Sequence, residues 1–507
     1  MRTTTSTRVI AGLSIWFGIT GATGVATAQT TSDEQWAATF ADYDISMARG
    51  DLQSAASALV EIIDDESLTE FHGDALLNLG NTVSDIGLPY GALLSYSSAL
   101  TQEEPVTAAV EKAINASEVV RDFGLLQGLF GDNVGIEGSP EEQSEMAWLA
   151  ALDNFRSGNL SVTLGILAII PTDAAAYPKA QHLKGIVLAQ QGRYNDSLAP
   201  LMTAFAMMED QSDMDLVNIN LGRSYFGAGN FARAIEYFAL VERGSPHWLE
   251  AQFERAWAHF RLEDVSGAVA LLLTHMSPFF DTRYYPEAEL LDTYSLFLLC
   301  KFPAATERIE HFRDSYRPIH DTLASALENM SDSDLFFAVT GGANQELPTR
   351  VFLDLHGEPR LQDAAAAVTQ AETEIERVRS VSNARLSEYF VEILQGRRDA
   401  IVAAEGSRIR GVLSGRLEAL NNMLADTEMA RLDILRLETR LYERAAGTGE
   451  IEGARNVAQR QLRIPPGHLS WPFQGEFWAD ELGYYRVNAI SECPESMQVG
   501  IETEEEE

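Results

Sequence analysis

The stretch from Asp215 to Pro246, DLVNINLGRSYFGAGNFARAIEYFALVERGSP, decides the fold of this chain. Two apolar segments with helical spacing lie on either side of a glycine-containing turn. Gly222 and Ala234 are small at the points where two antiparallel helices would cross closely, and Gly229 lies where the turn needs a positive φ. Pro246 ends the second helix and opens the next segment. The stretch therefore predicts one helix–turn–helix unit.

The same pattern recurs along the chain. Two clear copies contain Leu76, Leu79-Gly80, Val83, Gly87, Ala92, Tyr96 and Ala99, and Gly185, Leu188, Gly192, Tyr194, Leu201 and Ala204. Ala256 and Ala268 follow Gly222 and Ala234 by 34 residues, and a further copy spans 290–318. Weaker copies lie near residues 55–59 and 158–167, and residues 106–139 have the right length but fit poorly. We expect seven or eight helix pairs between Trp36 and Arg317.

This repeat resembles the tetratricopeptide repeat (TPR) family. The resemblance implies an all-α, right-handed solenoid whose first helices line a concave groove that holds peptides or helices of partner proteins. A helical bundle or another helix-pair solenoid is the alternative. The repeat phasing places these residues toward the groove: Asn81, His182, Gln190, Arg223, Phe226, Trp257, Phe260 and Arg261. We expect two or three of them only to contact neighbouring repeats, and Arg223, Trp257 and Arg261 to be the hot spots for a partner.

The repeat pattern does not continue after the last copy. The sequence divides into a solenoid at 29–318, a connecting helix and loop at 319–359 with a helix from His320 to Val339, a helical hairpin or coiled coil at 360–446, a cap at 447–500 and an acidic tail at 501–507. In the hairpin region apolar residues recur at intervals of three and four. Gln395-Gly396-Arg397 is the expected turn of a hairpin, and one long rod is the alternative.

Aromatic residues gather near the C-terminus. The cluster comprises Trp471, Phe473, Phe477, Trp478, Tyr484 and Tyr485, followed by a strand-like alternation to Ile490. Because aromatic side chains usually bury themselves, we expect a small, partly β cap over a solenoid or rod end. A platform for stacking sugars or peptides is the alternative.

The N-terminus has the features of a secretion signal. Arg2 and Arg8 precede an apolar stretch, and Ala26-Thr27-Ala28 provides a small-x-small cleavage site, so residues 1–28 are expected to be removed and the mature chain to begin at Gln29. The apolar stretch is short for a membrane span, although a retained signal anchor is the alternative. We expect a soluble exported protein, periplasmic or envelope-associated, with no membrane insertion after cleavage.

Charge and side-chain chemistry narrow the function classes. The 507 residues include 75 Asp and Glu against 37 Lys and Arg, a formal net charge of −38. This charge argues against nucleic acid and anionic lipid as partners, because both need clustered cations. The nine His residues show no metal-ligand spacing, and no nucleophile motif or phosphate loop is present. The sequence thus predicts no catalytic residues, no metal and no cofactor.

The chain has two cysteines, Cys300 and Cys493. In an oxidising compartment we expect them to form one disulfide, which would return the C-terminal segment to the last clear repeat. Two free thiols are the alternative. A straight rod of about 85 residues would carry its end roughly 130 Å away, so the bridge also requires the rod to turn back.

The layout of the whole chain resembles a group of exported TPR proteins of myxobacteria and their relatives, some of which are periplasmic parts of gliding-motility and envelope machinery. The resemblance lies in Leu291-Asp292-Thr293-Tyr294, in Cys300 with Phe302-Pro303-Ala304-Ala305, and in the run from Trp471 to Arg486. It implies a non-catalytic scaffold that binds other envelope proteins. A cell-wall binding module that uses the C-terminal aromatics is the alternative function.

Overall fold

The computed structural model describes residues 32–132, 137–341, 346–380, 383–448 and 475–493. Within these ranges the regular structure is entirely helical, so the predicted all-α class is confirmed and the helices form a TPR-like α-solenoid. The predicted signal segment 1–28, the acidic tail 501–507, and Trp471 and Phe473 of the predicted cap lie outside the described residues.

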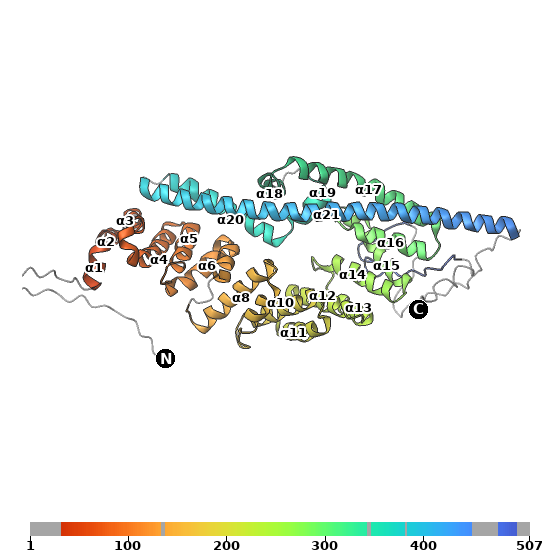
Figure 1. The fold of residues 1–507 in the computed structure, drawn as a ribbon, viewed down its shortest axis with the longest axis horizontal. Helices are drawn as coiled ribbons and strands as arrows, with labels where there is room; N and C mark the ends of the chain where they lie inside the picture. Colours follow the sequence, from red (N-terminus) through yellow and green to blue (C-terminus); the bar gives the residue numbers. More distant parts are fainter. Residues whose placement is uncertain (1–31, 133–136, 342–345, 381–382, 449–474, 494–507) are drawn as a thin grey trace, which may run out of the picture.

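The solenoid consists of a leading helix α1 (Ser32–Thr39) and eight antiparallel helix pairs (Figure 1). The pairs are α2 (Ala41–Ala48) with α3 (Leu52–Asp64), α4 (Thr69–Ile86) with α5 (Pro89–Leu100), α6 (Val110–Val120) with α7 (Phe123–Asp132), α8 (Pro140–Arg156) with α9 (Leu160–Leu167), α10 (Tyr177–Gln190) with α11 (Tyr194–Met207), α12 (Gln211–Gly227) with α13 (Phe231–Phe238), α14 (Trp248–Arg261) with α15 (Val265–His275), and α16 (Pro286–Leu298) with α17 (Phe302–Asn329). Short 3₁₀ helices, η1 (Glu66–Leu68), η2 (Thr107–Ala109) and η3 (Pro278–Phe280), lie between pairs.

One residue in the left-handed region ends the first helix of every pair. These residues are Gly50, Gly87, Arg121, Gly158, Gly192, Gly229, Glu263 and Cys300, and successive members are 37, 34, 37, 34, 37, 34 and 37 residues apart. Five of the eight are glycine, which adopts positive φ without a Cβ clash. Residues 106–139, which fit the sequence pattern poorly, also form a regular unit, with Arg121 at this position.

Close helix crossings hold each pair together. A Cβ atom added at Gly222 would lie 2.5 Å from the ring of Phe238, sixteen residues later. The same spacing joins Gly80 to Tyr96 and Gly185 to Leu201, with added Cβ atoms at 2.3 and 2.4 Å. The glycine of the first helix therefore accommodates the large residue of the second, as the sequence pattern predicts.

The chain then returns along the solenoid. Helices α18 (Asp332–Thr340), α19 (Thr349–His356) and α20 (Pro359–Arg379) lead back to the first units, and α21 (Ala384–Thr448) runs the length of the molecule again (Figure 1). Three ion pairs join α20, or the residue before it, to α21: Arg360 with Glu405, Glu372 with Arg398, and Glu358 with Arg408. Residue numbers rise along one helix as they fall along the other, so the two helices are antiparallel. At 65 residues α21 is about 100 Å long.

Two predicted boundaries are wrong. Gln395-Gly396-Arg397 lies inside α21, and the chain changes direction between the end of α20 at Arg379 and the start of α21 at Ala384. The Asn383 side chain accepts a hydrogen bond from the Leu386 N–H and caps α21. The predicted helix from His320 to Val339 is also wrong in its start, because α17 continues through Pro318 to Asn329 before α18 begins. A proline inside a helix removes one backbone hydrogen bond, and here the packing of α17 compensates for it.

Helices α17–α21 share one apolar core with the first four units. The core runs from Phe40 to Ala150 in the solenoid and from Phe312 to Leu424 in the returning helices. Leu413, Leu420 and Leu424, which belong to the apolar residues that recur at intervals of three and four in this region, are buried in this core. The apolar stripe of α21 therefore packs on the chain's own helices.

Two buried carboxylates fasten the returning helices to the turns of the early units. The Glu374 side chain of α20 is fully buried and accepts hydrogen bonds from the N–H groups of Tyr90 (2.8 Å) and Gly91 (2.9 Å) at the start of α5. Burial raises the pKa of Glu374. Asp122, before α7, accepts from Arg397 of α21 through both carboxylate oxygens at 2.7 Å, and from the Tyr90 hydroxyl at 2.7 Å. These contacts set the position of α20 and α21 along the solenoid.

The middle units lie apart from the returning helices. The apolar clusters of α10–α15, the three units that we call the middle units, contain no residue of α17–α21 within the described ranges. In Figure 1 α10 to α13 form the outermost part of an arc, and α21 passes along the open side of that arc. At the far end α21 rejoins the solenoid, where Ala430 and Ile434 pack against Phe302, Ala305 and Ile309 of α17. Helix α21 thus spans an arc that it contacts at both ends.

Replacing Arg397 with Met should destabilise the protein by about 3 kcal/mol, because Asp122 is left charged, buried and without its ionic partner. Arg398→Met is the matched control, since Arg398 pairs only at the surface with Glu372 and Asp399 and should change stability by less than about 1 kcal/mol. Urea denaturation measures both variants. Equal losses in the two variants would show that the Asp122 pair has no special role.

Candidate functional site

The first helices of the three middle units, α10, α12 and α14, form the inner side of the arc. Figure 1 shows α10 and α12 toward α21, and α11 and α13 on the outer side. Seven of the eight predicted groove residues lie on these three helices. The eighth, Asn81, lies on α4 and accepts a hydrogen bond from the Tyr96 hydroxyl of its own unit at 3.1 Å. We call the inner side of α10, α12 and α14 the inner face.

His182 joins α10 to α12. Its Nε2 lies 2.9 Å from the side-chain amide nitrogen of Asn220, which also donates to the Leu216 carbonyl oxygen. Burial lowers the pKa of His182 to about 4, so the imidazole is neutral at neutral pH and can accept the amide proton. His182 therefore serves as a contact between units. Gln190, at the end of the same helix, is exposed.

Arg223 joins α12 to α14. Its guanidinium lies 2.6 Å from Glu250 and 2.7 Å from Glu254, both on α14. The guanidinium thus already has two carboxylate partners within the chain. Although the sequence favoured Arg223 as a hot spot, its geometry is that of an inter-unit clamp. Sequence reasoning did not identify Glu250 and Glu254, which could have been found because they occupy groove-facing positions of the next repeat.

Aromatic rings and one further arginine lie next to the clamp. Phe226 packs edge-on against Phe231 at 5.1 Å between ring centroids, and the Arg261 guanidinium lies 4.7 Å over the Phe231 ring. Trp257 packs edge-on against Phe260 at 5.7 Å. We call the four predicted groove residues Phe226, Trp257, Phe260 and Arg261 the aromatic patch. Within the described residues Arg261 makes no ion pair, so it offers a cation beside partly buried rings.

An extended segment, residues 475–493, crosses α13 to α16; we call it the strap. Its backbone is held mostly by side chains of the solenoid: Arg243 donates to the Asp480 carbonyl oxygen, Thr274 Oγ1 accepts from Gly483, and Ser266 Oγ accepts from Ala489. The described part of the chain contains no β-strand, so the predicted β character of the cap is not supported there. The strap backbone forms hydrogen bonds with solenoid side chains and with one carbonyl oxygen at the end of a helix. None of the described residues forms a second strand with which the strap could make a β-sheet.

Some apolar and aromatic side chains of the strap are buried and others are exposed to solvent. Leu482 is buried and Phe477 and Tyr485 are partly buried against Trp248 and its neighbours. Trp478 and Tyr484, in contrast, are 57% and 72% exposed. Beneath the strap is a cavity of about 410 Å³ lined by Arg243, Ser245, Pro246, Trp248, Leu249, Phe279, Phe280, Arg283, Tyr285, Ala479 and Leu482. The strap thus covers part of the solenoid and also presents two aromatic rings.

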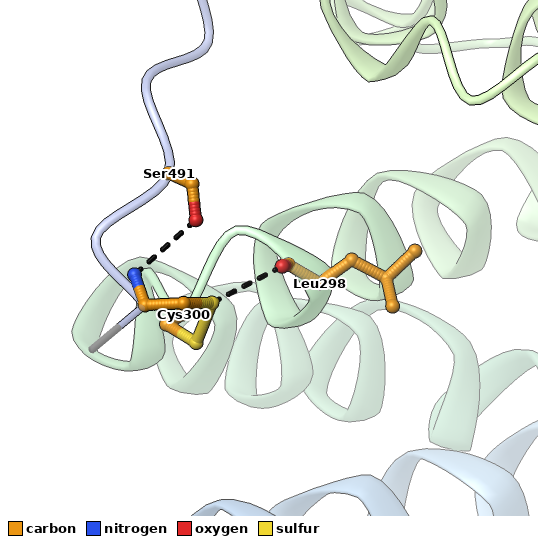
Figure 2. Close-up of a disulfide and its surroundings, with 4 residues drawn as sticks. Leu298, Cys300 and Ser491 are labelled. Atoms are coloured by element: carbon orange, nitrogen blue, oxygen red, sulfur yellow. Dashed lines mark hydrogen bonds between the residues drawn. A yellow bond between two sulfur atoms is a disulfide. The ribbon is translucent and has the colours of Figure 1, made fainter. Parts of the chain in front are cut away.

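Cys300 and Cys493 lie at disulfide distance and fasten the strap (Figure 2). Their Cα atoms are 4.9 Å apart, within the range that a disulfide requires. Glu492 donates its N–H to the Leu299 carbonyl oxygen at 2.8 Å, and Lys301 pairs with the Glu492 carboxylate at 3.1 Å. The Cys493 N–H donates to the Ser491 hydroxyl at 3.2 Å (Figure 2).

Other kinds of site are not found in the described ranges. No group of three or more His, Cys, Asp or Glu side chains is arranged to hold a metal ion there. Among the described helices, none combines the length and the apolar character that a membrane span requires.

The comparisons with known proteins identify the repeat. The tetratricopeptide repeat family matches residues 219–278, which comprise the second half of α12, all of α13, α14 and α15, and the first residue of η3. No curated protein matches the chain at a significant level. The match falls on the units that carry the Arg223 clamp and the aromatic patch. TPR repeats mediate protein–protein interactions, and all-helical TPR folds are typically non-catalytic scaffolds.

Cys493→Ser should release the C-terminal end of the strap and lower the free energy of unfolding by roughly 2–5 kcal/mol, because the bridge links residues 193 apart. Amide hydrogen exchange across residues 475–493 measures the release. Lys301→Ala removes only a surface ion pair and should leave this exchange unchanged. Equal protection in the wild type and Cys493→Ser would contradict the role given to the bridge.

Proposed function

We propose that this chain is a non-catalytic scaffold, exported to the periplasm or cell envelope, that binds a peptide or helix of another envelope protein along the inner face. The observation that carries the proposal is the position of the aromatic patch on the middle units. These units are separate from the core formed by α17–α21, whereas the first four units are built into it.

The geometry indicates what a partner would present. Rings that are partly buried on a helix face favour contact with an apolar side chain, and Trp is among the residues that contribute most to interface energy. Arg261 lies over two rings and has no carboxylate partner within the described residues. A partner helix or peptide with an apolar anchor and a nearby Asp or Glu therefore fits the patch. Arg223 takes a supporting role, because Glu250 and Glu254 already neutralise it.

The proposal also covers where the protein is located and the process in which it acts. The predicted secretion signal and the cysteine pair are each typical of an exported protein. A place within a multiprotein envelope or motility complex follows only from the resemblance of the chain layout. Fractionation of the native host, with N-terminal sequencing of the mature protein, tests export and the expected start at Gln29.

Trp257→Ala combined with Phe260→Ala should abolish co-purification of the partner, because both substitutions remove apolar surface from the aromatic patch. Full-length protein expressed in the native host, affinity purification and mass spectrometry provide the measurement, and circular dichroism verifies folding. The control is Phe337→Ala, which truncates an exposed ring on α18.

Photo-crosslinking locates the contact. A photoreactive residue at Gln190 on the inner face should capture the same partner, whereas one at Met202 on the outer helix α11 should not. Recovery of the partner by Trp257→Ala/Phe260→Ala at wild-type yield, or crosslinks from Met202 alone, would show that the inner face is not the binding surface.

The exposed rings of the strap favour one second candidate, binding of cell-wall glycan. Trp478 and Tyr484 are exposed on a segment that a disulfide anchors, and such rings can stack on sugars. In this case full-length protein should sediment with purified sacculi, and Trp478→Ala/Tyr484→Ala should remain in solution. Identical sedimentation of the wild type and the double variant would exclude the strap rings as a glycan site.

A further inference from the structure

The last turns of α21 extend beyond the solenoid. Figure 1 shows this end of the helix passing α16 and α17. One side of these turns is used inside the molecule, where Ala430, Ile434 and Leu437 pack on α16 and α17. The opposite side carries Leu432, Leu435, Thr439 and Tyr442.

This opposite side is an exposed seam with coiled-coil spacing. Leu432 is 41% exposed, Leu435 47% and Tyr442 76%. With Thr439, these residues follow one another at intervals of three, four and three, which is the spacing of the a and d positions of a heptad. We call Leu432, Leu435, Thr439 and Tyr442 the tip seam.

Charged residues flank the tip seam in a defined pattern. If Leu432 and Thr439 are a positions, Arg431 and Glu438 are g positions on one side of the seam. Arg436 and Glu443 are then e positions on the other side. Each flank therefore has one arginine and, seven residues later, one glutamate.

This pattern suits a second copy of the same helix in antiparallel orientation. Leu432 then faces Tyr442 of the second copy, and Leu435 faces Thr439 of the second copy. In that register Arg431 lies beside Glu438 of the second copy, and Arg436 beside Glu443 of the second copy, because g meets g and e meets e in antiparallel pairs. The two-fold symmetry repeats both contacts, which gives four Arg–Glu pairs around the seam.

A parallel pairing is disfavoured by the same residues. In parallel coiled coils a g position lies beside the e position five residues later on the other helix. Arg431 would then face Arg436, and Glu438 would face Glu443, so every flanking contact would join like charges. The flanking charges thus select the antiparallel arrangement and a single register.

We infer that the tip seam of α21 is a self-association surface, through which two copies of this chain pair antiparallel at the ends of their long helices. The inference does not depend on the partner proposed for the inner face. The intrahelical pairs Arg431–Glu428 and Arg436–Asp433 compete only weakly, because all four side chains are largely exposed. Dimerisation leaves the inner face of each copy open and doubles the number of binding faces.

Sedimentation equilibrium of the full-length protein over roughly 1–100 µM should show a monomer–dimer equilibrium. Leu432→Glu/Leu435→Glu should weaken it by at least about a hundredfold, since four leucines leave the interface. Leu353→Glu is the matched control, because it changes an exposed leucine on α19 and should leave the equilibrium unchanged. A wild type that is monomeric throughout, or a dimer unaffected by the double substitution, would overturn the inference.

Charge reversal tests the register. Arg436→Glu alone places Glu against Glu443 of the second copy, and Glu443→Arg alone places Arg against Arg436, so each variant by itself should dimerise about tenfold more weakly. An equimolar mixture of the two variants should dimerise as well as the wild type, because every e–e contact in the mixed dimer joins opposite charges. A mixture no stronger than the separate variants would contradict the antiparallel register.

Discussion

The attachment of helix α21 to both ends of the solenoid is the constraint on which the rest of the structure depends. At one end Arg397 is buried against Asp122 in the turn before α7, and at the other Ala430 and Ile434 pack on α17. Repeat arrays usually contact only their neighbours, so their curvature follows from small rotations accumulated from unit to unit. Here one helix of about 100 Å fixes the separation of the early and late units. The arc of the middle units, the return of the strap and the projecting helix tip all follow from this attachment.

Much of the solenoid could be predicted from the sequence, because its repeats use local rules. Gly222 and Phe238 define a close crossing within sixteen residues, and Gly229 defines a turn, so both can be recognised in one stretch. The turn residue alone does not define the repeat, because Arg121, Glu263 and Cys300 adopt the left-handed conformation that glycine adopts in the other five units. The path of α20 and α21 could not be predicted in the same way. Gly396 suggested a turn, but the contact that keeps this segment helical and in place joins residues 275 apart.

In the candidate site, too, local positions could be predicted from the sequence but contacts between units could not. The repeat phasing placed His182, Arg223, Trp257 and Arg261 on one side of the solenoid, but it could not show which of them already have partners within the chain. Whether Arg223 is free depends on Glu250 and Glu254 in the next unit, and therefore on the rotation between units. The cysteine pairing could be predicted because the chain has only two cysteines. The strand prediction failed because the alternation in the strap reflects contacts with solenoid side chains.

The double attachment of α21 also has a mechanical consequence. An open solenoid behaves as a spring, since a pull on its middle units is taken up by small rotations at every interface. A solenoid whose two ends are joined by a straight helix is a tied arch, in which the same pull tends to spread the ends and stretches the tie. The tie is a continuous helix, and its elongation is resisted by hydrogen bonds along its whole length. A load applied at the inner face would therefore deform the middle units little and would be carried as tension in α21 between its two attachments.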